Sequence, residues 1–194
     1  MLRKHQTPRY IVNRTLQLIY FKLNPDKPWM TKGSVKRLEK LLHEDMNLLE
    51  YGAGRSTNFY SARVKNVISI ETNKEWFNLV KVKANKNVSI HLNSTKEQSY
   101  LFEASESSFD IIINDAIHRD LVALQAFRSL KPGGILVIDN AERYIPNTFK
   151  VPESIGENSL GQNPNWTEFM SLTDGWSKEW YTDGVSCTLL MFKP

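Results

Sequence analysis

Four residues beside two apolar segments have the types and spacing of a nucleoside-binding site. Glu50 ends the apolar run Leu48-Leu49, Gly52 and Gly54 follow it, and Glu71 ends a second apolar run about twenty residues later. Glycines allow a chain to turn sharply and to approach a ligand closely. A carboxylate at the end of the next strand can accept hydrogen bonds from both hydroxyls of a ribose. The pattern therefore predicts a site for a nucleoside.

The residues around the glycines indicate which kind of nucleoside could bind. A dinucleotide site would usually continue with a third glycine, where this chain has Thr57, and Glu50 would face its phosphates. Glu-x-Gly-x-Gly suits a ligand that lacks phosphates and carries a cationic end, such as the sulfonium and ammonium of S-adenosylmethionine. A simple glycine turn in an unrelated α/β protein is the alternative interpretation.

Strands and helices are expected to alternate along the chain. Short apolar runs predict strands at 46–50, 66–71, 88–92, 110–114 and 135–138. Helical spacing of apolar residues predicts helices at 8–22, 35–42, 56–64, 72–84 and 119–130. The chain is expected to turn at 131–134, and 176–192 reads as two antiparallel strands joined at Asp183-Gly184.

This order predicts an α/β fold with a mostly parallel sheet covered on both faces. Ligands in such sheets bind outside the carboxyl ends of the strands, near the point where the strand order reverses. The polar residues expected at those ends are Glu50, Glu71, Asn93, Asp115 and Asp139.

The chain is long enough for one domain, residues 1–194, with a sizeable core. We expect a basic helical extension at 1–44, an α/β core at 45–194, and a lid over the acceptor side at 141–165, which is long and polar. Residues 1–40 hold ten Lys or Arg against two acids, a net charge of +8 within a total of +4. Such a region could meet nucleic acid, an acidic lipid surface or an anionic substrate, or could be the solvated face of helices.

Composition favours a protein of the cytoplasm. Cys187 is the single cysteine, so an internal disulfide is impossible, and the first residues lack the apolar core of a signal peptide. No apolar run approaches the ~18–20 residues that cross a bilayer. The oligomeric state is not indicated.

Four segments resemble the motifs of the class I S-adenosylmethionine-dependent methyltransferases, in order and at proper spacing. The segments are Glu50-Tyr-Gly-Ala-Gly-Arg-Ser-Thr, Val67-Ile-Ser-Ile-Glu-Thr-Asn-Lys-Glu-Trp, Phe109-Asp-Ile-Ile-Ile-Asn-Asp and Leu130-Lys-Pro-Gly-Gly-Ile-Leu-Val-Ile-Asp-Asn. The resemblance covers about residues 27–194. It implies a Rossmann-like three-layer sandwich with a seven-stranded sheet and an antiparallel C-terminal hairpin, S-adenosylmethionine as cofactor, and methyl transfer as activity.

The resemblance also implies which residues hold the cofactor. Gly52 and Gly54 would hold the methionine part, Glu71 the ribose, and Glu50 the amino group, partly through water. An acid often follows the third strand in this family to contact the adenine, whereas this chain has Asn93-Ser94-Thr95. The remaining implied cofactor contacts are Ser56, Thr57, Asp115, Trp29 and Thr31. The last two belong to the segment Pro28-Trp-Met-Thr, which resembles a segment that closes over the cofactor in a smaller subgroup of the family.

Methyl transfer to an alcohol requires alignment and removal of a proton, by a base or with a metal. Asp115, Asp139 and Asn140 match the positions at which metal-dependent O-methyltransferases hold one divalent ion, and all-oxygen ligation suits Mg²⁺. His118 falls where those enzymes have a basic residue, and histidine exchanges protons near neutral pH. His118 and Asp115 are therefore the catalytic candidates. An Asx turn at Asp139-Asn140 and a surface histidine are the alternatives.

Small-molecule O-methylation is the favoured function, and three others stay open. A nucleic-acid methyltransferase could use the basic N-terminal region, although Asn114-Asp-Ala-Ile-His does not resemble the Asn/Asp-Pro-Pro-aromatic motif of amine methylation. A cofactor-binding protein without transferase activity is the second alternative. A dinucleotide oxidoreductase is the third, and Glu50 and Thr57 count against it.

Overall fold

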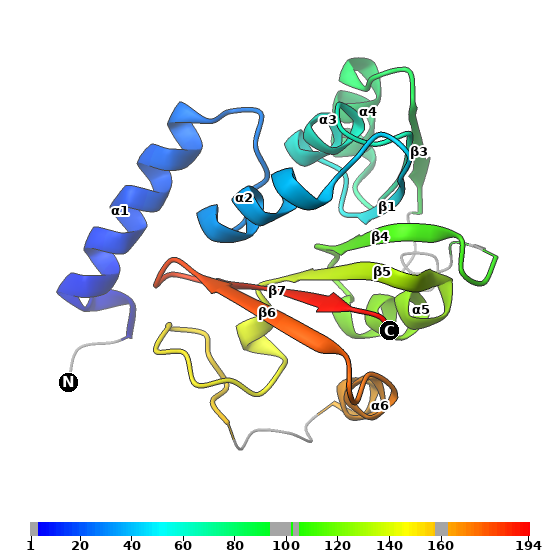
Figure 1. The fold of residues 1–194 in the computed structure, drawn as a ribbon. Helices are drawn as coiled ribbons and strands as arrows, with labels where there is room; N and C mark the ends of the chain where they lie inside the picture. The colour runs from blue at the N-terminus through cyan, green and yellow to red at the C-terminus, as the bar shows by residue number, and fades with distance from the viewer. Residues whose placement is uncertain (1–3, 94–101, 103–104, 158–162) are drawn as a thin grey trace.

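The computed structural model describes residues 4–93, 102, 105–157 and 163–194. Its centre is a seven-stranded sheet in the order β3-β2-β1-β4-β5-β7-β6 (Figure 1). The strands are β1 (Asn47–Tyr51), β2 (Asn66–Glu71), β3 (Val88–Leu92), β4 (Phe109–Asn114), β5 (Leu130–Asp139), β6 (Ser177–Thr182) and β7 (Cys187–Phe192). Neighbours from β3 to β5 are parallel, and β7 is antiparallel to both β5 and β6. The predicted fold class is confirmed.

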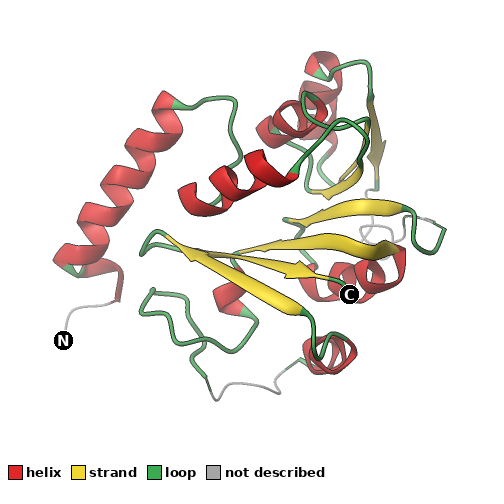
Figure 2. Ribbon diagram, viewed as in Figure 1, coloured by secondary structure: helices red, strands yellow, loops and turns green. Residues whose placement is uncertain are grey.

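Helices cover both faces of this sheet and complete three layers (Figure 2). Those helices are α2 (Lys32–Leu41), α3 (Arg55–Ser61), α4 (Lys74–Lys83), α5 (Arg119–Ser129) and α6 (Pro164–Leu172). Helix α1 (Pro8–Leu23) lies outside the layers, and η1 (Lys4–Gln6) and η2 (Ala141–Arg143) are short 3-10 turns. The core beneath α2 and α3 differs from the core beneath α5 and α6. None of the helices in the described part of the chain is long and apolar enough to cross a membrane.

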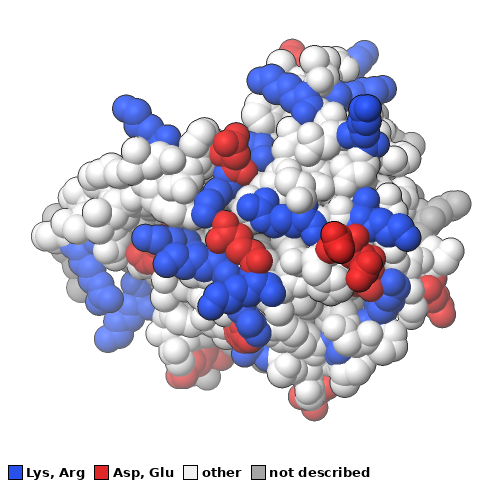
Figure 3. Space-filling model, turned by 45° about the horizontal axis from the view of Figure 1, so that its top comes forward, with Lys and Arg blue, Asp and Glu red and all other residues white. Residues whose placement is uncertain are grey.

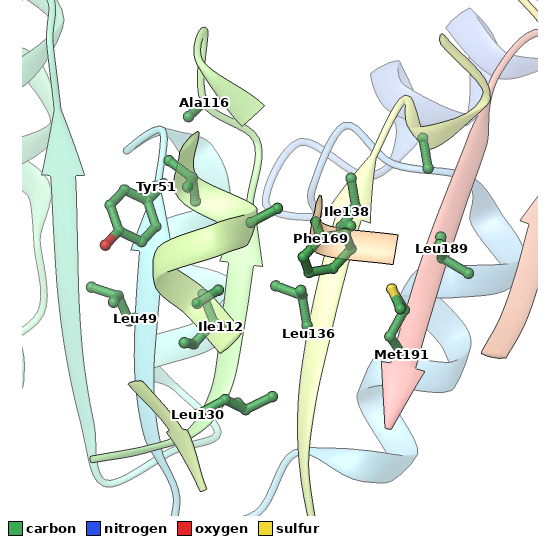
Figure 4. Packing of buried hydrophobic residues seen from close by; sticks show 14 of the residues in the cluster. Leu49, Tyr51, Ile112, Ala116, Leu130, Leu136, Ile138, Phe169, Leu189 and Met191 are labelled. Carbon is green, nitrogen blue, oxygen red and sulfur yellow. The ribbon is translucent and has the colours of Figure 1, made fainter. Parts of the chain in front are cut away.

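Alternation along the central strands supplies both cores. Leu48, Ile111 and Val137 pack under α2 and α3. Their neighbours Leu49, Ile112 and Leu136 pack under α5 and α6, together with Leu189 and Met191 of β7 (Figure 4). Strands that are buried on both faces appear in the sequence as continuous apolar runs, which is why the positions of these strands could be predicted.

Two elements differ from the sequence-based expectation. The expected turn at 131–134 lies inside β5, where Phe109 pairs with Leu130 but Ile111 pairs with Ile135. Four residues therefore loop out opposite one, and Lys131 Nζ contacts Asp110 Oδ1 at 2.7 Å. Helix α6 was not predicted.

An asparagine-proline start signals α6 in the sequence. Asn163 caps the helix by accepting from the Asn165 amide, and Pro164 occupies its first turn. The side-chain amides of Asn163 and Asn165 both donate to Asp120 Oδ2, at 2.9 and 2.8 Å, which joins α6 to α5.

Helix α1 lies along the edge of the sheet at which the parallel strands end. The β6–β7 turn is at the same edge, because Thr188 near the start of β7 pairs with Asp139 at the end of β5. Gln17 of α1 donates to Asp183 in that turn at 2.6 Å. Arg55 at the start of α3 donates to the carbonyl of Asn24, just after α1, at 2.6 Å. The division into a basic extension and a core stays a prediction.

Candidate cofactor site

A cavity of about 250 Å³ opens at the carboxyl ends of β1, β2 and β4. The strand order reverses here, since the chain continues from β1 to β2 on one side and later returns to β4 on the other. This is the place at which open α/β sheets bind ligands. The lining residues are Tyr51, Gly52, Ala53, Ile70, Glu71, Thr72, Asn73, Asp115, Ala116 and Ile117.

Gly52 forms the wall between two strand ends. Its φ of +99° lies in the left-handed region, and its amide donates to the carbonyl of Ile70 at 2.9 Å. A Cβ at this position would lie 2.7 Å from the carbonyl oxygen of Asp115. Both the backbone conformation and the close approach therefore require glycine.

Glu71 presents a carboxylate to the cavity from the end of β2. Its side chain is buried, and Oε1 accepts hydrogen bonds from the amides of Thr72 at 2.8 Å and Asn73 at 2.7 Å. Among the described residues no donor contacts Oε2. One oxygen is thus fixed by the backbone, which leaves the other for a ligand.

Glu50 lies beneath the glycine loop and not on the cavity surface. Hydroxyls of Ser56, Thr57 and Ser69 donate to its carboxylate at 2.5, 2.6 and 2.7 Å. Burial raises the pKa of Glu50 to about 7, and the three hydroxyls oppose that rise. In the structure the carboxylate organises the loop, and its two oxygens are occupied by protein donors.

The same loop is closed by two further hydrogen bonds. The amide of Gly54 donates to Thr57 Oγ1 at 3.0 Å, and the indole of Trp76 donates to the carbonyl of Ala53 at 2.6 Å. Ser56 and Thr57, predicted to contact the cofactor, direct their hydroxyls to Glu50, and their contact with the cofactor stays a prediction.

Arg119 occupies the space between the ends of β4 and β5. Its guanidinium donates to the Ala116 carbonyl at 2.5 Å, to the Asp139 carbonyl at 2.9 Å and to Asn140 Oδ1 at 3.4 Å. It also pairs with Asp115 Oδ1. The guanidinium is mostly buried, whereas the Asp115 side chain is 41% exposed toward the cavity.

The carboxylate of Asp139 accepts a hydrogen bond from β7, while its main-chain carbonyl accepts from Arg119. Oδ1 accepts from the Thr188 hydroxyl at 2.8 Å, and the Thr31 hydroxyl lies 3.3 Å from the same Thr188 oxygen. Burial raises the pKa of Asp139 well above its usual range, and the nearby charge of Asp115 adds to the rise. Thr31 is therefore part of a buried network behind β5.

The predicted metal site is not supported. Its three residues, Asp115, Asp139 and Asn140, all contact the guanidinium of Arg119, and Asp139 does so only through its main-chain carbonyl. A cation of the protein itself thus sits where the ion was expected. In addition, the described residues contain no cluster of three or more His, Cys, Asp or Glu side chains that could hold a metal ion.

Comparison with solved structures finds many similar folds. An S-adenosylmethionine-dependent methyltransferase from Aquifex aeolicus is 19% identical, with a TM-score of 0.55 over 88% of this chain and 96% of its own. A Haloferax volcanii protein in complex with the Trm112 methyltransferase activator is 12% identical, with a TM-score of 0.59 over 89% of this chain and 92% of its own. The tRNA (m1A58) methyltransferase TrmI of Aquifex aeolicus is 12% identical, with a TM-score of 0.53 over 81% of this chain and 66% of its own.

The chain shares its fold with these solved structures. No protein-family model matches the sequence, and a search of curated proteins finds no match. At these identities the likeness concerns the fold, so the site residues have to be judged from their own geometry.

The structure places the remaining predicted residues as follows. His118 precedes α5 and directly follows the cavity-lining Ile117, and its imidazole is partly exposed. The amide of Asn93 donates to the Glu71 carbonyl at 2.8 Å, while Ser94 and Thr95 lie outside the described residues. Trp29 is 64% exposed and stacks near Arg55, with 5.4 Å between the guanidinium carbon and the ring centre.

Three features of the site were not predicted from the sequence. Ser69 faces Glu50 because it is the paired residue of the neighbouring strand, a register that the two apolar runs already imply. Ile117 lines the cavity although it is 75% exposed. The central position of Arg119 gave no local signal, because its partners come from the ends of two separate strands, β4 and β5.

Proposed function

We propose that the protein is an S-adenosylmethionine-dependent methyltransferase. The observation that carries the proposal is the cavity at the switch point, where a half-satisfied carboxylate of Glu71 faces the backbone turn at Gly52. The fold shared with solved methyltransferases supports the assignment.

The charge of the cavity favours this cofactor over a dinucleotide. The described lining residues include two acids, Glu71 and Asp115, and no lysine or arginine. Phosphates would be repelled there, whereas a sulfonium and an ammonium group would be attracted. In this proposal Glu71 Oε2 would accept from a ribose hydroxyl, and Asp115 is the exposed acid at the β4 end.

For the acceptor we propose a small molecule with a hydroxyl group and no metal ion. The acceptor oxygen would form a bond to the methyl carbon as the carbon–sulfur bond breaks, and the hydroxyl proton would pass to the imidazole of His118. His118 suits this role because it follows the cavity wall directly and its side chain is partly open to solvent. Arg119 would hold Asp115 and the β5 end in position.

A nucleic-acid acceptor is the alternative, since the tRNA methyltransferase TrmI shares the fold and residues 1–40 carry a net charge of +8. Part of that charge is already paired. Arg37 makes two hydrogen bonds of 2.9 Å to Glu179, an acid outside residues 1–40. Lys27 contacts Glu39 at 2.9 Å, a pair within the region that the net charge already includes. This pairing favours the small-molecule acceptor.

Binding of the cofactor product tests the assignment. We expect S-adenosylhomocysteine to bind in calorimetry in the micromolar range, about −8 kcal/mol, and NAD not to bind. Glu71→Gln should weaken binding by about 1–3 kcal/mol, because a hydrogen bond to a charged group is lost while the shape of the side chain is kept. Glu75→Gln, on the neighbouring helix α4, is the matched control. Binding of NAD without S-adenosylhomocysteine would overturn the proposal.

A further inference from the structure

Helix α1 turns its apolar side outward. Six of its aliphatic side chains are between 49% and 74% exposed: Ile11 at 54%, Val12 at 57%, Leu16 at 60%, Leu18 at 51%, Ile19 at 49% and Leu23 at 74%. We call these six residues the outer face of α1. With 3.6 residues per turn they occupy one broad side of the helix.

The side of α1 that meets the protein is polar. Gln17 is its one buried residue, and its amide donates to Asp183 of the β6–β7 turn at 2.6 Å. Asn13 packs against Gly184 so closely that a Cβ there would lie 2.0 Å from its Nδ2. The usual orientation of an amphipathic helix, with apolar residues toward the core, is therefore reversed.

An exposed apolar surface of this kind marks an interaction site. It continues past the end of the helix to the exposed Trp29, whose ring centre lies 6.0 Å from that of Phe21 in α1. A partner that binds this surface must accommodate its apolar side chains and complement the charge around them.

That surrounding charge is positive. Arg9, Arg14 and Lys22 lie on α1, and residues 1–25 contain no Asp or Glu. At the left of Figure 3 the surface is largely uncharged, with lysine and arginine groups around it. A second α1 would bring three more cations and no acid, so pairing of two copies through this helix is disfavoured.

We propose that α1 docks the protein on an anionic lipid surface, with the outer face among the acyl chains and Arg9, Arg14 and Lys22 at the headgroups. A helix that is apolar on one side and carries Lys and Arg binds in the plane of such an interface without crossing it. The helix lies at the same sheet edge as the cofactor cavity, so docking would bring that edge of the sheet close to the membrane. The proposal does not depend on methyl transfer.

Sedimentation with vesicles tests this docking. The full chain is mixed with vesicles of phosphatidylcholine alone and of phosphatidylcholine with about 30% phosphatidylserine. We expect at least tenfold stronger binding to the anionic vesicles, weakened by salt. Leu16→Glu with Ile19→Glu should reduce binding at least tenfold, and Arg14→Gln with Lys22→Gln should remove the preference for anionic lipid.

A matched control uses exposed aliphatic residues elsewhere. Leu79 and Val82 of α4 are 57% and 87% exposed, so Leu79→Glu with Val82→Glu changes the same chemistry at another helix and should leave binding unchanged. Circular dichroism verifies that each variant is folded. Failure of the folded wild-type protein to bind, or equal loss in the α4 control, would overturn the proposal. So would a wild-type dimer in sedimentation equilibrium that Leu16→Glu with Ile19→Glu converts to monomer, since a second copy would then be the occupant.

Discussion

At the scale of single residues, Glu50 makes stability depend on pH. Its carboxyl group is almost fully buried, and burial raises its pKa from 4.5 to about 7. The folded state therefore holds the proton more tightly than the unfolded chain does. The contribution of this group to the free energy of unfolding is fully present below pH 4.5 and is lost as the pH rises through about 7.

Glu50→Gln should remove this dependence, because glutamine does not titrate. The free energy of unfolding of the wild-type protein, minus that of the variant, should fall by on the order of 3 kcal/mol between about pH 4.5 and pH 8. Urea unfolding of both proteins across this range measures the difference. A difference that stays constant with pH would contradict the assigned environment of Glu50.

His118 should affect turnover and not cofactor binding. If its imidazole accepts the proton of the acceptor, His118→Ala should lower kcat roughly 100- to 10,000-fold while the Kd for S-adenosylhomocysteine stays nearly unchanged. A screen of hydroxyl acceptors by mass shift supplies the substrate. A metal chelator should not reduce turnover, given the position of Arg119. Near-normal turnover of the variant would leave His118 as a surface residue.

Among residues, those of the glycine turn could be predicted and those of its surroundings could not. Gly52 and Glu71 depend on a local pattern of strand, turn and strand, which the sequence displays directly. The role of Arg119 depends on contacts to the ends of β4 and β5, which only the packed sheet brings together. Thr31 shows the same limit, because its partner Thr188 is far along the chain.

At the scale of elements, the segment after β5 is held together by Asn147. Its buried side chain donates to the carbonyls of Glu142 at 3.1 Å and Ile145 at 2.8 Å. It also accepts from the Phe149 amide at 3.1 Å and the Ser154 hydroxyl at 2.8 Å. One side chain thus replaces the regular hydrogen bonds that a helix or strand would provide.

Asn147→Ala should loosen this segment. We still expect limited proteolysis to cut first within 141–165 in the free protein and to be slowed by ligand, as for a lid. The variant should be cut several-fold faster there, because four hydrogen bonds are lost. Thr148→Ala, an exposed neighbour, is the control. Equal cleavage rates for both variants and wild type would argue that other contacts hold the segment.

Element boundaries were predictable where apolar residues are continuous. The expected strands at 66–71 and 88–92 match β2 and β3, and the hairpin at Asp183-Gly184 is confirmed. The loop inside β5 was harder to predict, because the chain continues the same strand after these four residues. Helix α6 follows a long polar segment, and the Asn163-Pro164 start was too weak a signal to predict a helix there.

At the scale of the whole molecule, charge is divided between the N-terminal region and the rest. Residues 1–40 carry +8 and the other residues −4. Any RNA would meet the positive side first. We expect only weak RNA binding that is lost near ~200 mM salt, since Lys27 and Arg37 are already paired with acids. Fluorescence anisotropy with a labelled tRNA, titrated with salt, measures this. Tight binding that survives such salt would favour the nucleic-acid acceptor.

The guanidinium of Arg119 provides a permanent positive charge between the ends of β4 and β5. Four oxygens from Asp115, Ala116, Asp139 and Asn140 surround it. A free ion in such a cage would come and go with its concentration in the surroundings, whereas arginine stays charged at every physiological pH. The positive charge at this edge is therefore encoded in the gene, one per polypeptide, and does not vary with the metal content of the cell.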